Sequence, residues 1–216
     1  AIAANKKGCS VLIIEREKRL GGILKQCIHD GFGLIQFGEK LSGPEYAERY
    51  VDQVKSEGIP YLTQTFVTKI VEDHGEYHVY LVTQNGIEEC VTKSLILATG
   101  CRERTARQVM IQGTRPAGIY TAGTAQYLTN ILGEMPTKKC VILGSGDIGL
   151  IMARRLTLEG ASVFGVYEVK PTPSGLDRNL VQCLEDYQIP LHLSHTVTRV
   201  FGDERLIGVE VAMVDE

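Results

Sequence analysis

Apolar residues follow two spacings along the chain, one typical of strands and one typical of helices. Four short runs are almost wholly apolar and stop at glycine or a charged residue: 11–14, 94–100, 139–143 and 162–167. Such runs predict buried parallel strands. Residues 150–159 are longer and helix-forming, and they lie between the last two runs. The order strand, helix, strand predicts an α/β fold.

The second half of the chain repeats the first half. Residues 58–70 recur without a gap, 130 positions later, as residues 188–200. An amphipathic helical stretch immediately precedes each copy, and the copy itself contains an Ile-Pro dipeptide and a strand. Upstream, residues 8–15 resemble residues 160–168 once one residue is inserted. We therefore expect one βαβ-type unit to occur twice, with about 23 extra residues between Glu15 and the Ile-Pro of the first copy.

A glycine-rich loop joins the strand 139–143 to the following helix. It has the pattern Gly144-x-Gly146-x-x-Gly149. The first glycine permits a tight turn, the second lets backbone N–H groups approach a pyrophosphate, and the third lets the helix pack closely. The loop therefore predicts dinucleotide binding, with a ligand-free turn as the alternative. The Lys-Ser/Thr pair of an NTPase phosphate loop is missing.

An acidic residue ends the second strand of each copy. Glu168 follows the first loop glycine by 24 positions, where a carboxylate accepts hydrogen bonds from a ribose 2′-hydroxyl and repels a 2′-phosphate. NAD is therefore favoured, while Lys170 leaves NADP as the alternative. Glu15 holds the corresponding place in the first copy and is expected to bind the ribose of a second nucleotide. Arg16 beside it is either a further contact or a surface charge.

Two glycine-containing segments of the first copy suit close passage of a ligand. Gly21-Gly22 follows Glu15, although such a pair is also an ordinary turn. Ala98-Thr99-Gly100 ends the run 94–100, which we expect to be a buried core strand. Cys27 and His29 lie in the extra segment of the first copy, where a spectator thiol and a packing histidine are favoured over contact with a ligand.

Composition excludes several classes of protein. Apolar residues make up 44% of the 216 residues, and 23 Lys plus Arg against 26 Asp plus Glu give a net charge of −3. This balance provides no basic face for nucleic acid. No apolar run approaches the roughly 18 residues of a membrane span. We expect a soluble protein without a nucleic-acid partner and without a membrane span.

The cysteines and histidines indicate neither bridges nor a metal. The six cysteines include no C-x-x-C pair, so reduced thiols are expected. His192 and His195 are three residues apart, and on one strand they would point to opposite faces. We therefore predict no metal site.

These features, in this order, resemble the FAD-dependent pyridine nucleotide-disulphide oxidoreductase family, with the two dinucleotide-binding units of a thioredoxin-reductase-like flavoprotein. The resemblance implies two Rossmann-like units with parallel sheets, each with a small antiparallel β-meander, and hydride transfer between nicotinamide and flavin. It implies two sets of cofactor-binding residues. Those near FAD are Glu15, Arg16, Gly21, Gly22, Val67, Ala98, Thr99 and Gly100, and those near NAD are Gly144, Gly146, Asp147, Ile148, Gly149 and Glu168.

The chain departs from the disulfide-reducing members of that family. Neither a C-x-x-x-x-C pair after Gly22 nor a C-x-x-C pair before Gly144 is present, so disulfide reduction is not expected. Residues 115–126 instead resemble a non-thiol branch, which includes opine- and amine-oxidising subunits and flavoproteins associated with bacterial glycerol-3-phosphate dehydrogenase. That branch implies a cytoplasmic, oligomeric enzyme with a small-molecule or protein electron acceptor and a possible partner dehydrogenase subunit.

The expected domains are a partial FAD-binding domain, residues 1–112, and an NAD(P)-binding domain, residues 113–216. By analogy with Gly144 and Gly160, a phosphate loop before Gly8 would begin upstream of Ala1. We therefore expect a fragment with weak or absent FAD binding. Three functions remain open: an NADH-linked flavoenzyme with a non-disulfide acceptor, a flavin-linked amine or opine dehydrogenase subunit, and a non-catalytic module that responds to nucleotides.

Overall fold

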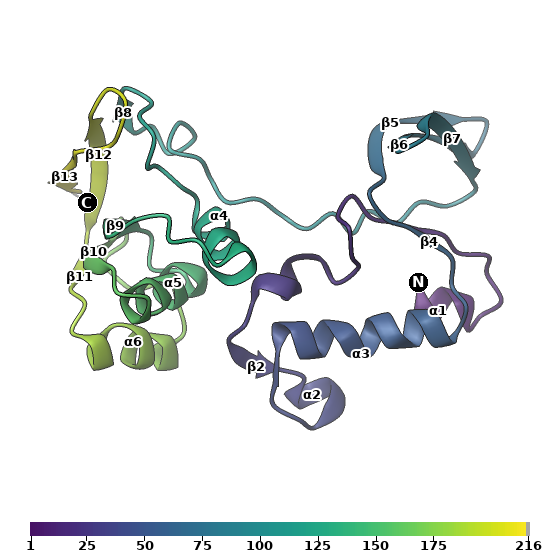
Figure 1. Ribbon diagram of the computed structural model, residues 1–216, viewed down its shortest axis with the longest axis horizontal. Helices are drawn as coiled ribbons and strands as arrows, with labels where there is room; N and C mark the ends of the chain where they lie inside the picture. The colour runs from purple at the N-terminus through teal and green to yellow at the C-terminus, as the bar shows by residue number, and fades with distance from the viewer. Residues whose placement is uncertain (215–216) are drawn as a thin grey trace. The chain divides into compact units, whose positions relative to one another are not determined.

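The computed structural model describes residues 1–214 (Figure 1). The chain divides into two compact units, Ala1–Gly100 and Cys101–Glu216, which we call unit 1 and unit 2. Among residues 1–214, no helix is both long and apolar enough to cross a bilayer.

Unit 1 combines a small parallel sheet, a long helix and an antiparallel meander. Its elements are α1 (Ile2–Asn5), β1 (Ile13–Ile14), the 3₁₀ helix η1 (Gly22–Gln26), β2 (Asp30–Phe32), α2 (Leu34–Phe37), β3 (Leu41–Ser42), α3 (Gly43–Ser56), β4 (Tyr61–Leu62), β5 (Phe66–Asp73), β6 (Glu76–Thr83) and β7 (Gly86–Thr92). Strands β1 and β4 are parallel, and β5, β6 and β7 form the antiparallel meander.

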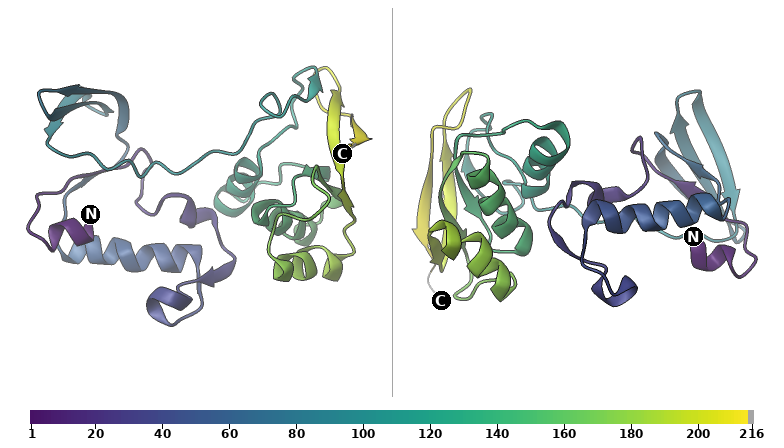
Figure 2. Two further views of the ribbon diagram at one scale, coloured as in Figure 1. Left: turned by 180° about the vertical axis from the view of Figure 1, so that it is seen from behind. Right: turned by 60° about the horizontal axis from the view of Figure 1, so that its bottom comes forward.

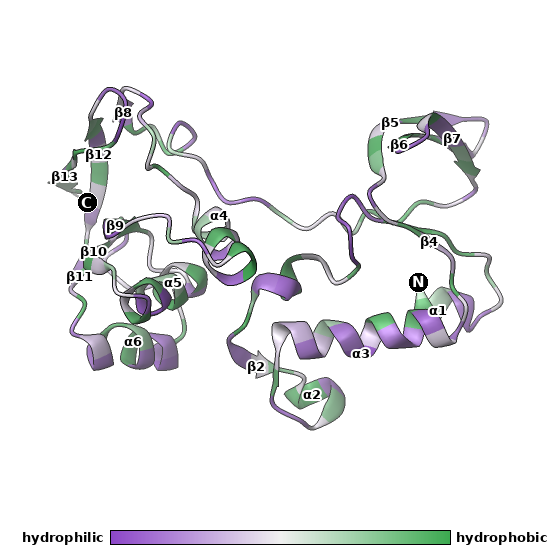
Figure 3. Cartoon of the chain, in the orientation of Figure 1, coloured by the Kyte–Doolittle hydropathy of each residue, from purple (hydrophilic) through white to green (hydrophobic). Residues whose placement is uncertain are grey.

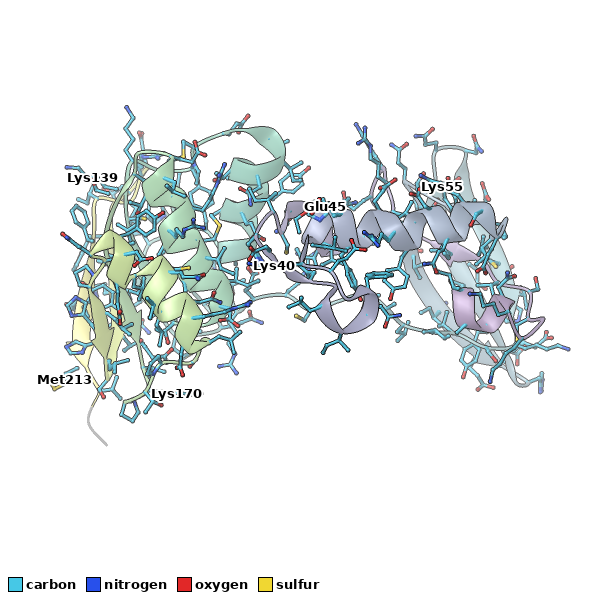
Figure 4. The ribbon with its side chains drawn as sticks, turned by 90° about the horizontal axis from the view of Figure 1, so that it is seen from below. Lys40, Glu45, Lys55, Lys139, Lys170 and Met213 are labelled. Atoms are coloured by element: carbon cyan, nitrogen blue, oxygen red, sulfur yellow. The ribbon has the colours of Figure 1, made fainter. Side chains whose placement is uncertain are left out.

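Helix α3 organises unit 1 because both its start and its inner face are specified by sequence. Ser42 caps the helix, and the Glu45 side chain accepts a hydrogen bond from the Ser42 N–H in return, which completes a capping box. Figure 4 shows Glu45 at the first turn and Lys55 near the other end, an arrangement that suits the helix dipole. Apolar and polar residues alternate around the helix (Figure 3), and Ala47 and Val54 are buried.

Unit 2 combines a three-stranded parallel sheet, with helices on one face, and a second three-stranded sheet. Its elements are β8 (Gln112–Gly113), α4 (Ala122–Tyr127), the π-helical turn η2 (Leu128–Leu132), β9 (Lys139–Leu143), α5 (Asp147–Leu158), β10 (Ser162–Glu168), α6 (Asp177–Cys183), the 3₁₀ turn η3 (Glu185–Tyr187), β11 (Leu191–Leu193), β12 (His195–Phe201) and β13 (Gly208–Met213). The sheet order is β11-β10-β9, and all three strands are parallel.

The core of unit 2 lies between this sheet and helices α5 and α6. Leu150 and Ala153 of α5 pack with Val166 of β10 and Leu184 after α6, and all four are buried. Burial of side chains of this size contributes about 1.5 to 3 kcal/mol each, except for the alanine. The views in Figure 2 show α5 and α6 on one side of the strands. Lys139 and Lys170, at the start of β9 and just after β10, lie at opposite ends of the strand layer (Figure 4).

The structure confirms the internal repeat. Ile13 pairs with Tyr61 between β1 and β4, and the residues at the matching positions, Val166 and Leu191, pair between β10 and β11. The N–H of Ile13 donates to the Pro60 carbonyl over 3.1 Å, and the N–H of Val166 donates to the Pro190 carbonyl over 2.8 Å. Each Ile-Pro dipeptide therefore places its carbonyl in the same rung of a parallel sheet.

The single inserted residue of the second copy is a β-bulge. Between β9 and β10 the register advances by two residues on β9, from Cys140 to Ile142, but by three on β10, from Val163 to Val166. A bulge absorbs one extra residue without changing the pairing on either side. Gly165 lies within it, and a Cβ there would stand 3.1 Å from the His192 ring. The close approach explains why this position is glycine.

The expected buried strand at residues 94–100 does not form. The segment pairs with no strand among residues 1–214, and the side chains of Ile96 and Leu97 are 79% and 69% exposed. A strand becomes part of a sheet only by pairing with a neighbouring strand, however apolar its own residues are. The prediction of a buried core strand is therefore wrong for this structure.

Two further features differ in detail from the expected fold. The α/β class with parallel sheets is confirmed, but the antiparallel part of unit 2 is the hairpin β12–β13, joined by β8 in parallel with β12. The two compact units also divide after Gly100, whereas the expected boundary between cofactor domains lies after residue 112. Residues 101–112 pack with unit 2 because Glu103 accepts a hydrogen bond from Gly123 N–H and Gln112 pairs with Arg199. The assignment of cofactor domains to the two units stays a prediction.

Candidate functional site

The three glycines of the loop in unit 2 occupy three different environments. Gly144 has φ +99°, a conformation that strongly favours glycine. A Cβ on Gly146 would meet no atom within 4 Å, so the backbone there borders open space. A Cβ on Gly149 would stand 2.6 Å from the Gly144 carbonyl oxygen. The loop therefore turns sharply, leaves its middle open and lets helix α5 approach the end of β9.

The open middle of the loop coincides with the start of α5. This helix begins at Asp147, three residues before the start expected from sequence, and Gly146 is its N-cap. The N–H groups of Asp147, Ile148 and Gly149 belong to the first turn and have no acceptor within the helix. Free N–H groups, the positive end of the helix dipole and open space together fit a phosphate group of a dinucleotide. Direct contact between these residues and NAD stays a prediction.

Glu168 ends β10 beside this loop, but its carboxylate is enclosed by the protein. The residue is only 4% exposed. Oε2 accepts hydrogen bonds from the Ser145 N–H at 3.0 Å, the Ser145 hydroxyl at 2.6 Å and the Ser174 hydroxyl at 3.1 Å. Oε1 accepts one from the Lys170 N–H at 3.1 Å. A carboxylate has about four acceptor positions, and these four hydrogen bonds match that number.

These donors determine the charge of the buried carboxylate. Burial by itself raises the pKa of Glu168, but the hydrogen bonds from Ser145, Lys170 and Ser174 outweigh it and leave the pKa below its ordinary value. Glu168 is therefore an anion at neutral pH. A fixed negative charge at this position disfavours a second negative group, such as a ribose 2′-phosphate.

The segment after β10 is held over the glycine loop. The Ser174 N–H donates to the Ser145 hydroxyl at 2.9 Å, and the Leu176 N–H and the Asn179 side chain both donate to Asp147 Oδ1 at 2.8 Å. Gly175 lies so close that a Cβ would stand 2.6 Å from Leu150 Cδ1 and 2.8 Å from the Ser145 carbonyl oxygen. Asp147, which we expected near NAD, therefore anchors this segment.

In unit 1, Glu15 follows β1 at the position that matches Glu168. It is half-buried, and its Oε1 accepts one hydrogen bond, from the Glu17 N–H at 2.9 Å. The Lys170 N–H makes the equivalent bond to Glu168. Among the described residues, no hydroxyl is bonded to Glu15, and no group donates a hydrogen bond to its second oxygen. That oxygen is therefore open to a ligand. Arg16 forms an exposed ion pair with Glu17, at 3.2 Å.

The structure brings together only some of the other residues that we expected near FAD. Gly21 and Gly22 have φ +112° and +55°, and Gly21 lines an apolar pocket of about 210 Å³ together with Ile13 and Ala47. Val67 lies on β5 and is exposed, and residues 98–100 lie in the exposed segment before unit 2. Residues 1–14 contain no Gly-x-Gly-x-x-Gly loop. The described part of unit 1 therefore fits a nucleotide ribose at Glu15 but contains no phosphate loop beside it.

The thiols and histidines outside the loop are placed by packing. Cys27 is buried with its Sγ 3.4 Å from the Ile23 carbonyl oxygen, and burial raises the pKa of this thiol, so it remains protonated. The His29 ring lies 5.2 Å from that of Phe32. Within residues 1–214, all six cysteines are free thiols, and no cluster of three or more His, Cys, Asp or Glu side chains is arranged to hold a metal.

His192 and His195 do not point to opposite faces of one strand, and that expectation is wrong. His192 lies on β11 and His195 begins β12, with Ser194 at φ +54° turning the chain between them. The two rings are 6.0 Å apart, and His192 also stacks on Tyr167 at 4.7 Å. A left-handed residue between two short strands is not visible in a hydrophobic pattern.

Sequence reasoning missed the partners of Glu168. Ser145 is fully buried within the loop, and Ser174 comes from the segment after β10. Ser145 occupies a position that the Gly-x-Gly-x-x-Gly pattern leaves undefined. Ser174 lies in a Pro-Thr-Pro-Ser-Gly run, which signals only a turn.

With this geometry established, comparison with known proteins identifies the family. The model of the pyridine nucleotide-disulphide oxidoreductase family matches residues 1–216. The chain belongs to this family. Members bind FAD and NAD(P).

Curated relatives are more distant, and the chain matches only part of them. Hydrogen cyanide synthase subunit HcnB of Pseudomonas aeruginosa is 28% identical over 164 residues, which cover 69% of this chain and 35% of that protein. The subunit of the same name from Pseudomonas protegens is 27% identical over 175 residues, which cover 78% of this chain and again 35% of the relative. The chain thus matches about a third of the length of these relatives.

Solved structures share the fold. Thioredoxin reductase from Lactococcus lactis superposes with a TM-score of 0.72 at 19% identity, covering 99% of this chain and 67% of that chain. Thioredoxin reductase from T. acidophilum gives a TM-score of 0.68 at 20% identity, covering 98% and 65%. At this level of identity the likeness concerns the fold alone.

Proposed function

We propose that this chain is part of an FAD-dependent, NADH-linked oxidoreductase that passes electrons to an acceptor other than a disulfide. The observation that carries the proposal is the loop of unit 2. Gly144 turns it, Gly146 leaves it open, and Gly149 brings the first turn of α5 to the same place. Membership of the family supports the pairing of this nucleotide site with a flavin.

The residues of the chain hold and orient nucleotides. When bound, a nicotinamide supplies a hydride and a flavin accepts it. In unit 2 the N–H groups of Asp147 and Ile148 would hold a phosphate, and Glu168 would face the adenosine ribose with a fixed negative charge. In unit 1 the open oxygen of Glu15 would accept a hydrogen bond from the ribose of FAD. Hydride transfer from nicotinamide to flavin needs neither an acid nor a base. The protein therefore contributes orientation of the two cofactors and exclusion of water.

The proposal of a non-disulfide acceptor rests on the cysteines. The chain contains neither of the spaced cysteine pairs expected of disulfide-reducing members of the family. Burial raises the pKa of Cys140 to about 11 and also raises the pKa of Cys27 and Cys183. A protonated thiol is a poor nucleophile for thiol–disulfide exchange.

A partner subunit is a second part of this proposal. Both curated relatives are named as subunits of hydrogen cyanide synthase, which supports assembly of this chain into a multi-subunit enzyme. We further propose that the enzyme works in the cytoplasm, where its six free thiols would stay reduced.

Stopped-flow mixing of the full-length protein with NADH tests the proposal. We expect the flavin absorbance to bleach. Gly146→Ala should raise the NADH concentration needed for half-maximal bleaching by about tenfold or more, because its methyl group enters the space left for phosphate. The residue has φ −64° and no atom within 4 Å of the added Cβ, so folding should be unaffected.

Gly208→Ala is the matched control. Gly208 lies on β13, away from the loop, and a Cβ there also meets no atom within 4 Å. Flavin bleaching by an amine or opine, with none by NADH, would instead assign the protein to the flavin-linked dehydrogenases. NAD-dependent affinity for a partner without any electron transfer would identify a non-catalytic module.

A further inference from the structure

Ser145 and Ser174 hold the carboxylate of Glu168 in one position. The Ser174 N–H donates to the Ser145 hydroxyl, and both hydroxyls donate to Glu168 Oε2. The Ser145 N–H adds a third bond to the same oxygen. The four groups form a closed ring of hydrogen bonds around one buried oxygen, which we call the serine lock.

The lock changes what Glu168 can do when a nucleotide arrives. An exposed glutamate has freely rotating side-chain bonds and can turn its charge into water at little cost. Turning Glu168 away would leave the buried Ser145 N–H without an acceptor, which carries the desolvation penalty of that group. The charge therefore stays where it is.

We propose that Ser145 and Ser174 are specificity-determining residues, which make the nucleotide site of unit 2 reject a ribose 2′-phosphate by preventing Glu168 from moving aside. This inference rests on the proposed nucleotide site. The inference adds two positioning residues to the acidic residue that carries the charge. The two serine hydroxyls act only through Glu168 and would not contact the nucleotide's reacting atoms.

Unit 1 supplies an internal comparison for the lock. Glu15 accepts a hydrogen bond from the Glu17 N–H, which is equivalent to the bond from the Lys170 N–H to Glu168. Among the described residues, however, no hydroxyl is bonded to Glu15. The lock is thus an addition to a shared backbone arrangement and not a requirement of the strand end. NAD must be distinguished from NADP, which carries a 2′-phosphate, whereas FAD has no such phosphorylated analogue. A ribose site for FAD therefore gains nothing from a fixed negative charge.

The test measures binding of NAD⁺ and NADP⁺ to the full-length protein by isothermal titration calorimetry, which does not depend on turnover. The wild type should prefer NAD⁺. Ser174→Ala should reduce the ratio of the two affinities by about tenfold, chiefly by strengthening NADP⁺ binding, because one charge-assisted hydrogen bond on Glu168 is lost. Ser174→Thr keeps a hydroxyl and should restore the ratio.

Two further variants fix the interpretation. Glu168→Gln removes the charge and should abolish the preference. Ser162→Ala is the matched control, since Ser162 begins the same strand at the end remote from Glu168. Thermal unfolding of each variant, followed by circular dichroism, shows whether it is folded. Ser174 is on the surface, so its alanine variant should fold.

The possible results separate the two proposals. If the wild type binds neither nucleotide, the proposed nucleotide site is wrong. If the wild type prefers NAD⁺ and folded Ser174→Ala keeps the full preference, the site stands and the serine lock is overturned. If Ser174→Ala lowers the ratio but Ser174→Thr does not restore it, the Ser174 hydroxyl does not hold the preference, and the inference also fails.

Discussion

The two units contain the same strand end in two different states. Glu15 and Glu168 both follow a parallel strand, and each accepts a hydrogen bond from the backbone N–H two residues later. Glu168 has three more donors and is buried, whereas Glu15 has an open oxygen. The shared backbone shows what the repeat preserved. The different surroundings show that equivalent residues acquire different properties from the segments packed around them.

Removal of the two carboxylates should give the largest difference between the units. Glu168→Ala should destabilise unit 2 by about 2 to 4 kcal/mol, because the buried Ser145 N–H loses its acceptor and the ring of hydrogen bonds opens. Glu15→Ala should change the stability of unit 1 by less than about 0.5 kcal/mol. Hydrogen exchange followed by mass spectrometry resolves the two units. Equal effects in both units would show that burial of Glu168 has no energetic consequence.

The glycine loop of unit 2 offers a second, smaller effect. Gly149→Ala should cost unit 2 about 1 to 3 kcal/mol, because its Cβ would stand 2.6 Å from a backbone oxygen and α5 must shift. Gly146→Ala is the paired variant in the same loop and should cost far less. Urea unfolding measures both. A Gly149→Ala protein as stable as the wild type would contradict the close packing of helix and strand.

Acid should affect unit 2 through Glu168. The pKa of this group is lowered in the folded state, so its contribution to stability is present above the ordinary glutamate pKa of about 4.3. That contribution is lost as the pH falls through the lower pKa of the folded protein. Glu168→Gln should remove this part of the pH dependence, and Glu15→Gln should leave unit 2 unchanged. Urea unfolding monitored from neutral pH to below pH 4 checks both variants.

The smallest expected effect concerns the turn before each Ile-Pro. Gly58 and Gln188 hold equivalent left-handed positions, with φ +65° and +55°. Gly58→Ala should destabilise unit 1 by about 1 kcal/mol, and Gln188→Gly should stabilise unit 2 by less than that, because glycine also loses more entropy on folding. Thermal unfolding provides the measurement. The same sign for both variants would contradict the equivalence of the two turns.

Much of the fold follows from local patterns. The glycine loop lies between the predicted strand and helix, and the inserted residue of the repeat is the bulge at Gly165. The run 94–100 has the pattern of a buried strand and is not one, because hydropathy describes the segment and not its neighbours. At the candidate site, the sequence indicated the glycines and Glu168 but gave no indication of Ser174.

The sequence by itself determined the repeat, the turns and the place of each acidic residue. These depend on interactions within a few positions of the chain, such as glycine conformation, helix capping and the alternation of apolar residues. Tertiary structure decided which of the two carboxylates is enclosed. Its donors come from Ser145, 23 residues before Glu168, and Ser174, six residues after it. Only the folded chain brings them together, because hydrogen bonds form between groups that meet in space.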